Sequence, residues 1–146
     1  GYDYSVFHTN KDTIITVNLL LRLGDKNRAR ATSIAWATRK RLQPSNSAGC
    51  SFQNLDHETQ TRLNLESNGW GYIIDKVLNL KGYQVGNAKI SERHAAFIET
   101  KPGATAADVL AIFEKIHTDS KAKLGITPKA EIFFLGFANS EVEKYR

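Results

Sequence analysis

The most constraining feature of the sequence is the stretch from Thr105 to Leu124, which carries an apolar stripe and both end signals of a helix. Thr105 and Asp108 have the spacing of a capping box, in which each side chain bonds the other residue's backbone N–H. Gly125 follows where helices often end in a left-handed residue. Apolar residues recur at helical spacing at Val109, Ile112, Phe113 and Ile116. A chain with this helix needs a second layer that buries the stripe.

Upstream, apolar and polar residues alternate over residues 13–23, with one apolar face formed by Ile15, Val17, Leu19 and Leu21. This period of two predicts a strand. From Asp25 to Leu42 the spacing becomes helical, and Asp25 stands where an N-terminal cap is expected. A strand followed by an amphipathic helix is the prediction.

Four further segments complete the expected fold. We predict a short helix over residues 71–78, two adjacent strands or a hairpin over 83–90 and 95–100, and a buried strand over 130–137. Strands and helices mix without a regular βαβ alternation, which favours the α+β class. The prediction is a single domain with a mixed, largely antiparallel sheet and two to three amphipathic helices packed on it.

Composition excludes several classes of protein. A length of 146 residues with 41% hydrophobic and 24% charged residues is ordinary for one globular domain. The apolar run at 14–21 is interrupted by Thr16 and Asn18, so no membrane partner is indicated, and no charged-then-apolar leader opens the chain. The single cysteine fits a reducing compartment, and we predict a cytoplasmic protein.

Charge gives a weaker signal. The formal net charge is +5, and basic residues cluster at Arg28, Arg30, Arg39, Lys40 and Arg41. An anionic partner is worth considering, but a solvated helix face is the favoured interpretation. No aromatic residues are interleaved as in nucleic-acid sites, so no nucleic-acid partner is predicted. No metal site is predicted either, because ligand spacing is lacking among His8, His57, His94 and His117.

Two residues attract attention on chemical grounds. Cys50 lies between Gly49 and Ser51 in a polar loop, where small neighbours let a ligand approach the thiol, although an inert thiol is the simpler interpretation. Glu131 stands at the start of an apolar run. Because burying a lone carboxylate is costly, it must lie at a sheet edge, be paired, or be held for function.

A series of motifs in fixed order carries a family resemblance. The motifs are YDYSVF at 2–7, SAGCSFQN at 47–54, GYIID at 71–75, LKGYQVGNA at 80–88, SERHAAFI at 91–98 and GATAADVL at 103–110. Together with Glu131 and Gly136 they resemble the carboxyl-terminal half of the UDP-N-acetylenolpyruvoylglucosamine reductases. The likeness extends over nearly the whole chain.

The resemblance implies a role in peptidoglycan synthesis. In that family two amino-terminal domains hold FAD, NADPH reduces it, and the carboxyl-terminal domain protonates the reduced UDP-N-acetylglucosamine enolpyruvate. Cys50 matches the serine or cysteine that gives the proton, and Glu131 matches a glutamate that stabilises or protonates the same intermediate. The resemblance also implies substrate-binding roles for Tyr2, Ser5, Arg41, Asn54 and His94.

The same resemblance predicts a division of the chain. Residues 1–12 would continue from a missing FAD-binding domain, 13–137 would form the substrate-binding domain, and 138–146 would be a frayed tail. FAD and NADPH would belong to the full enzyme and not be bound by this chain alone, which begins at Gly1 like a piece of a longer protein. Asp3 replaces the family's usual arginine, so a non-catalytic UDP-sugar binding module is the alternative.

Overall fold

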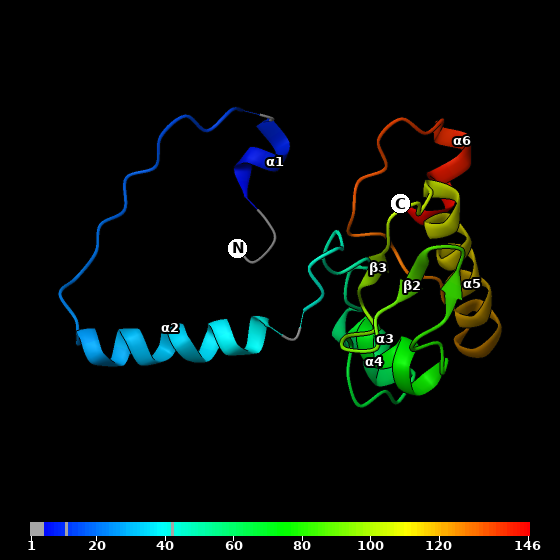
Figure 1. Cartoon of the computed structure of the whole chain (residues 1–146), viewed down its shortest axis with the longest axis horizontal. Coiled ribbons are helices and arrows are strands. Elements are labelled where there is room, and N and C mark those ends of the chain that lie inside the picture. The colour runs from blue at the N-terminus through cyan, green and yellow to red at the C-terminus, as the bar shows by residue number, and fades with distance from the viewer. Residues whose placement is uncertain (1–4, 11, 42) are drawn as a thin grey trace. The chain divides into compact units, whose positions relative to one another are not determined.

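A computed structural model describes residues 5–10, 12–41 and 43–146 (Figure 1). By its internal contacts the chain divides into two units, Gly1–Ala35 and Trp36–Arg146. The first unit contains helix α1 (Val6–Asn10) and most of helix α2 (Lys26–Lys40). The second unit contains the sheet, the remaining helices and the core.

The predicted strand over residues 13–23 is absent from the structure. Residues 12–25 have neither helix nor strand geometry, and Ile15 and Leu21 are 90% and 80% exposed. The reason is that a strand obtains its backbone hydrogen bonds from a neighbour, and no described residue forms a ladder with this segment. The alternating apolar residues therefore indicated a segment that could form a β-strand, but they did not identify a strand with which it pairs.

Helix α2 begins as predicted, because the Asp25 carboxylate accepts hydrogen bonds from the backbone N–H groups of Asn27 and Arg28 at 2.8 and 3.2 Å. None of its residues is buried.

The sheet of the second unit is antiparallel and has three short strands. These are β1 (Gln84–Val85), β2 (Ala88–Ile90) and β3 (Ile98–Thr100), in the order β1-β2-β3. The pairing of β2 with β3 confirms the adjacent strands predicted over 83–90 and 95–100, but residues 83–90 are not one strand, because a turn divides them into β1 and β2. The turn between β1 and β2 requires Gly86, whose φ is +52° and whose Cβ, if present, would lie about 2.5 Å from Asp108 Oδ1.

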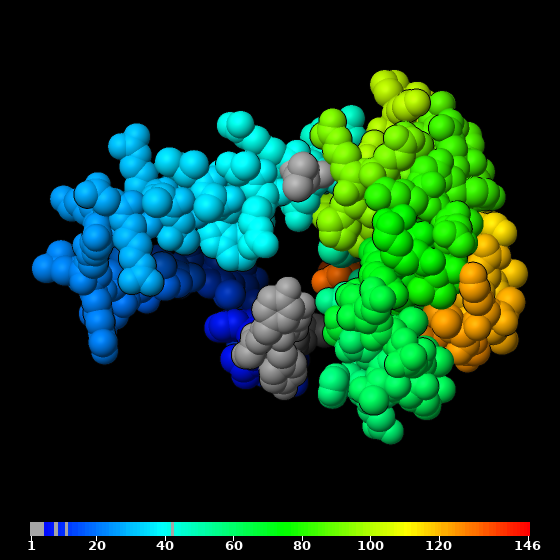
Figure 2. Space-filling view, turned by 90° about the horizontal axis from the view of Figure 1, so that it is seen from below, coloured from blue at the N-terminus to red at the C-terminus, as the bar shows by residue number. Residues whose placement is uncertain are grey.

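Helix α5 (Ala106–Leu124) packs against β1 and β2. Both predicted end signals are present: Thr105 and Asp108 form the capping box at 3.0 and 3.2 Å, and Gly125 is left-handed with φ +70°. The helix buries Ile112, Phe113, Ile116, His117 and Ser120. Figure 2 shows from a second side how its carboxyl-terminal part, in orange, covers one flank of the green residues.

Two helical pieces line the other part of the core. Helix α4 (Trp70–Tyr72) continues into the π-helix η1 (Ile73–Val77). Together they occupy the place of the short helix predicted over 71–78. The π geometry appears in the bond from Leu78 N–H to the carbonyl of Ile73, five residues earlier, at 2.8 Å. Helix α3 (His57–Arg62) is capped by Asp56, in a stretch to which the sequence assigned no role.

The carboxyl-terminal predictions need two corrections. Residues 130–137 form no strand; Ala130 makes one bridge to Phe52, and Phe133 is 91% exposed. The run is apolar, but only its alternate residues face the core, which leaves Phe133 and Leu135 in solvent. The predicted frayed tail is instead ordered as helix α6 (Asn139–Val142) and the 3-10 helix η2 (Glu143–Tyr145), because it buries two apolar side chains.

The observed class is α+β with an antiparallel sheet, as predicted. Within the described residues, no helix has the length and apolar character required to cross a membrane.

Candidate functional site

The site is built around an extended segment at residues 50–53, which hydrogen-bonds to two neighbours. On one side, Ser51 N–H donates to the carbonyl of Ala96 at 2.8 Å, and Cys50 bridges Phe97. On the other side, Glu131 N–H donates to the carbonyl of Ser51 at 2.9 Å. These backbone bonds bring together three segments that are distant in the sequence, and they place Cys50 and Glu131 beside each other.

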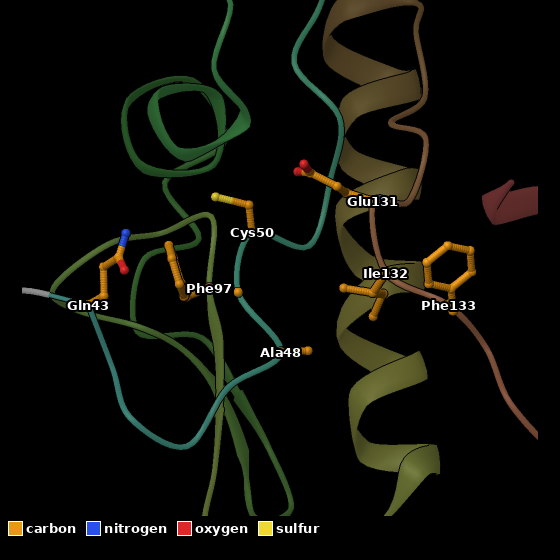
Figure 3. A pocket seen from close by; sticks show the side chains of 8 residues that line it. Gln43, Ala48, Cys50, Phe97, Glu131, Ile132 and Phe133 are labelled. Atoms are coloured by element: carbon orange, nitrogen blue, oxygen red, sulfur yellow. The ribbon is translucent and has the colours of Figure 1, made fainter. Parts of the chain in front are cut away.

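A pocket of about 580 Å³ opens at this junction (Figure 3). Both predicted catalytic residues line it, and Figure 3 shows the Glu131 side chain reaching towards Cys50. The full lining is Gln43, Ala48, Gly49, Cys50, Phe97, Glu131, Ile132 and Phe133. The pocket therefore combines a thiol, a carboxylate and a carboxamide with apolar walls, and none of the described lysines and arginines lines it.

Electrostatics at the pocket favour a protonated thiol. Cys50 is an exposed residue with a free thiol. Its pKa is raised, first because surrounding protein atoms partly desolvate the sulfur and second because the Glu131 carboxylate repels a thiolate. An ordinary thiol has a pKa of about 8.5. At neutral pH, Cys50 is therefore a proton donor, with little of the thiolate character that a nucleophile needs.

Two of the predicted substrate-binding residues, Asn54 and His94, line other pockets than this one. Asn54 lines a second cavity of about 340 Å³ with Trp70, and His94 lines a third of about 230 Å³. The His94 ring packs edge-on against Phe97 with centroids 4.8 Å apart, so it contacts a wall of the Cys50 pocket from behind. Its Nδ1 accepts a hydrogen bond from Ala96 N–H at 3.3 Å.

The remaining three predicted residues are Arg41, Ser5 and Tyr2. Arg41 is exposed and lines no described pocket. Ser5 belongs to the first unit, and Tyr2 lies outside the described residues. Their roles stay predictions.

Apart from Cys50 and Glu131, the lining residues were not predicted as site residues; they are Gln43, Ala48, Gly49, Phe97, Ile132 and Phe133. Phe97 ends the SERHAAF run, and its place next to His94 in a shared motif was the available signal. Gln43 begins the polar loop and carries no local mark of function. No cluster of three potential metal ligands occurs among the described histidine, cysteine and acidic residues.

Replacing Glu131 by glutamine tests the electrostatic link to Cys50. We expect the thiol pKa to fall, because the charge that opposes ionisation is removed, while the desolvation of the sulfur, which is the larger cause, remains. The chain has one cysteine, so the pH dependence of alkylation by iodoacetamide reports this thiol alone. Glu58→Gln removes an exposed carboxylate of helix α3 outside the pocket and is the matched control. Identical profiles for the two variants would contradict the link.

Comparison with known proteins gives one consistent result. A family model described as UDP-N-acetylenolpyruvoylglucosamine reductase, C-terminal domain, matches residues 42–135. The reductase of that name from Heliobacterium modesticaldum is 31% identical over 146 residues, which cover 98% of this chain and 43% of the relative. The one from Gloeobacter violaceus is 36% identical over 100 residues, covering 67% and 30%.

Among solved structures, the crystal structure of UDP-N-acetylenolpyruvylglucosamine reductase from Thermus caldophilus has a TM-score of 0.55 and 27% identity. That alignment covers 75% of this chain and 36% of the other. This chain thus spans less than half the length of these relatives.

Proposed function

Because the chain belongs to the UDP-N-acetylenolpyruvoylglucosamine reductase family and matches its carboxyl-terminal domain, we propose that it is the substrate-binding and proton-donating part of such an enzyme. The reaction would convert UDP-N-acetylglucosamine enolpyruvate to UDP-N-acetylmuramate for peptidoglycan synthesis. The observation that carries the proposal is the meeting of Cys50 and Glu131 at one pocket.

The proposed chemistry divides between this chain and the rest of the enzyme. Reducing the enolpyruvyl double bond requires a hydride at one carbon and a proton at the other. The hydride would come from FAD reduced by NADPH. The Cys50 thiol would give the proton and then regain one from solvent. The raised thiol pKa supports this role, since the acid form persists at neutral pH and re-forms readily after transfer.

Glu131 would act on the same intermediate. Its carboxylate disfavours the Cys50 thiolate and so maintains the proton at sulfur. The apolar wall formed by Phe97 and Ile132 would lower the local polarity and so strengthen the repulsion between the Glu131 carboxylate and a Cys50 thiolate.

The pocket residues do not fit the flavin. A dinucleotide diphosphate is held by cations, by a helix amino terminus or by a glycine-rich loop. The lining offers a carboxylate instead, with neither Lys nor Arg, and none of its residues lies in a described helix. We therefore assign FAD and NADPH to protein outside this chain, which would also be its partner.

The substrate's own diphosphate needs a cation, and Arg41 is our candidate because it precedes the lining residue Gln43 by two positions. Asn54 and His94 line two other cavities, from which they would contact other parts of a bound substrate, and Tyr2 and Ser5 would contribute from the preceding segment.

Turnover by the full-length enzyme tests the proposal. Protein carrying this chain together with its flavin domains is expected to oxidise NADPH only when UDP-N-acetylglucosamine enolpyruvate is added. The measurement is the loss of NADPH absorbance with and without substrate. Tight binding of the substrate with no oxidation would instead support the non-catalytic UDP-sugar module, and failure to bind would remove both readings.

A further inference from the structure

The carboxyl-terminal hook, defined as residues 139–145, is anchored in the core by its last residue. Tyr145 is 3% exposed, and its ring packs edge-on against Phe113 and His117 with centroids 5.5 and 4.8 Å apart. A third ring, Phe134, lies 5.9 Å away. The hook also lies beyond residues 42–135, the part that the family model matches. Its packing is therefore a feature that the family match does not explain.

Polar contacts fix the hook to helix α5. The Tyr145 hydroxyl donates to Glu114 Oε2 at 2.8 Å, and the Lys144 ammonium pairs with the same oxygen. The pKa of Glu114 is lowered, first by the Lys144 bond and then by the Tyr145 bond, so the acceptor stays charged. Figure 1 shows the red end of the chain against α5. The hook is thus held to the longest helix of the fold by both rings and charges.

The backbone of the hook reaches the residue before Glu131. Ala130 N–H donates to the carbonyl of Tyr145 at 2.6 Å. The carbonyl of Ala130 accepts from Gln53 Nε2 at 3.2 Å, and Glu131 N–H donates to Ser51 at 2.9 Å. The amide group before the Ala130 Cα is therefore bonded on its N–H side to the hook and on its Lys129 carbonyl side to Gln53 N–H at 2.9 Å, and the amide group after it is bonded to the Cys50 segment alone.

Among the described residues, no hydrogen bond or ion pair holds the Glu131 side chain, and only its backbone is bonded. The residue is exposed, and the segment that follows it is not part of a sheet. An extended segment without a ladder is oriented only by its few fixed points. Of these, the Tyr145 carbonyl and the contact between the Tyr145 and Phe134 rings act before and after Glu131, respectively.

We propose that Tyr145 is a positioning residue that holds Glu131 at the Cys50 side of the pocket, through the Ala130 backbone and the Phe134 ring. The catalytic consequence rests on the proposed function. The positioning does not, because it is measurable on the thiol of the isolated chain without turnover. A failed turnover assay would therefore leave this inference intact, and a failed thiol assay would leave the proposed function standing.

The test measures the Cys50 thiol pKa by alkylation at a series of pH values in the 146-residue chain. Tyr145→Ala is expected to lower the thiol pKa, in the same direction as Glu131→Gln and by no more than that variant does. The double variant should show no further shift, because both changes remove the same carboxylate from the thiol. Additive shifts in the double variant would overturn the proposal.

Two controls separate positioning from loss of stability. Leu78→Ala makes a cavity at a buried site outside the hook and the pocket, and its thiol pKa should equal that of wild type. The backbone carbonyl is present in every variant, and Tyr145→Phe also keeps the ring that anchors it in the core, so this variant should also titrate like wild type. If Tyr145→Ala does not fold by circular dichroism, Tyr145→Leu takes its place with the same outcomes. A wild-type profile in the folded variant, or an equal shift in Leu78→Ala, would refute the positioning role.

Discussion

Replacing Cys50 by alanine in the full-length reductase is expected to slow reoxidation of its flavin by substrate by about 10²-fold to 10⁴-fold, the usual contribution of a general acid. Reduction of the flavin by NADPH should proceed at the wild-type rate. The reason is that the thiol lines the pocket and its raised pKa keeps it protonated at neutral pH, which suits it to proton transfer in the second half-reaction. Rapid mixing that follows the flavin absorbance resolves the two half-reactions separately.

Cys50→Ser is the informative companion variant, because a hydroxyl retains a transferable proton in a side chain of nearly the same size. We expect it to recover much of the rate lost in the alanine variant. Ser51→Ala is the neighbouring control, since its buried side chain lies outside the Cys50 pocket. Equal reoxidation rates in wild type and Cys50→Ala would exclude the thiol as the acid.

The helix over 106–124 was predictable because its signals are local. Thr105, Asp108 and Gly125 act within one turn of the helix ends, and the apolar stripe depends only on sequence spacing. The pairing of Cys50 with Glu131 had no local signal. It depends on backbone bonds to Ala96 and Ser51, and the sequence pointed to it only through a family resemblance.

The two strands that were wrongly predicted share one cause. Residues 13–23 and 130–137 have the composition of strands, but a period of two does not identify a partner, and neither segment has a ladder among the described residues. The prediction for the hook was wrong in the opposite sense, because it expected disorder where the structure has helices. Its polar sequence indicates fraying, yet Val142 and Tyr145 are buried against residues that lie far away in the chain. Local sequence patterns indicate which secondary structure a segment favours, and contacts with distant residues decide whether that structure forms.

Replacing two phenylalanines, one buried and one exposed, tests whether packing determines how much each contributes to the free energy of unfolding. Phe113 is fully buried, and its ring contacts Phe52, Phe134 and Tyr145 with centroids 4.6, 5.6 and 5.5 Å apart. Phe113→Ala is therefore expected to lower the free energy of unfolding by about 3–5 kcal/mol, through lost burial and the cavity left behind. Phe133, 91% exposed, is chemically identical, and its replacement should change that free energy by less than about 0.5 kcal/mol.

Urea denaturation of the 146-residue chain, followed by tryptophan fluorescence, measures both variants against wild type. Phe133 lines the Cys50 pocket, so its alanine variant should keep the fold and alter the site, whereas Phe113→Ala should loosen the core beneath the hook. Because Phe113 also packs on Tyr145, the loss extends to the segment that supports Glu131. Equal destabilisation by the two substitutions would mean that the apolar run after Glu131 is buried in solution, against the exposure described above.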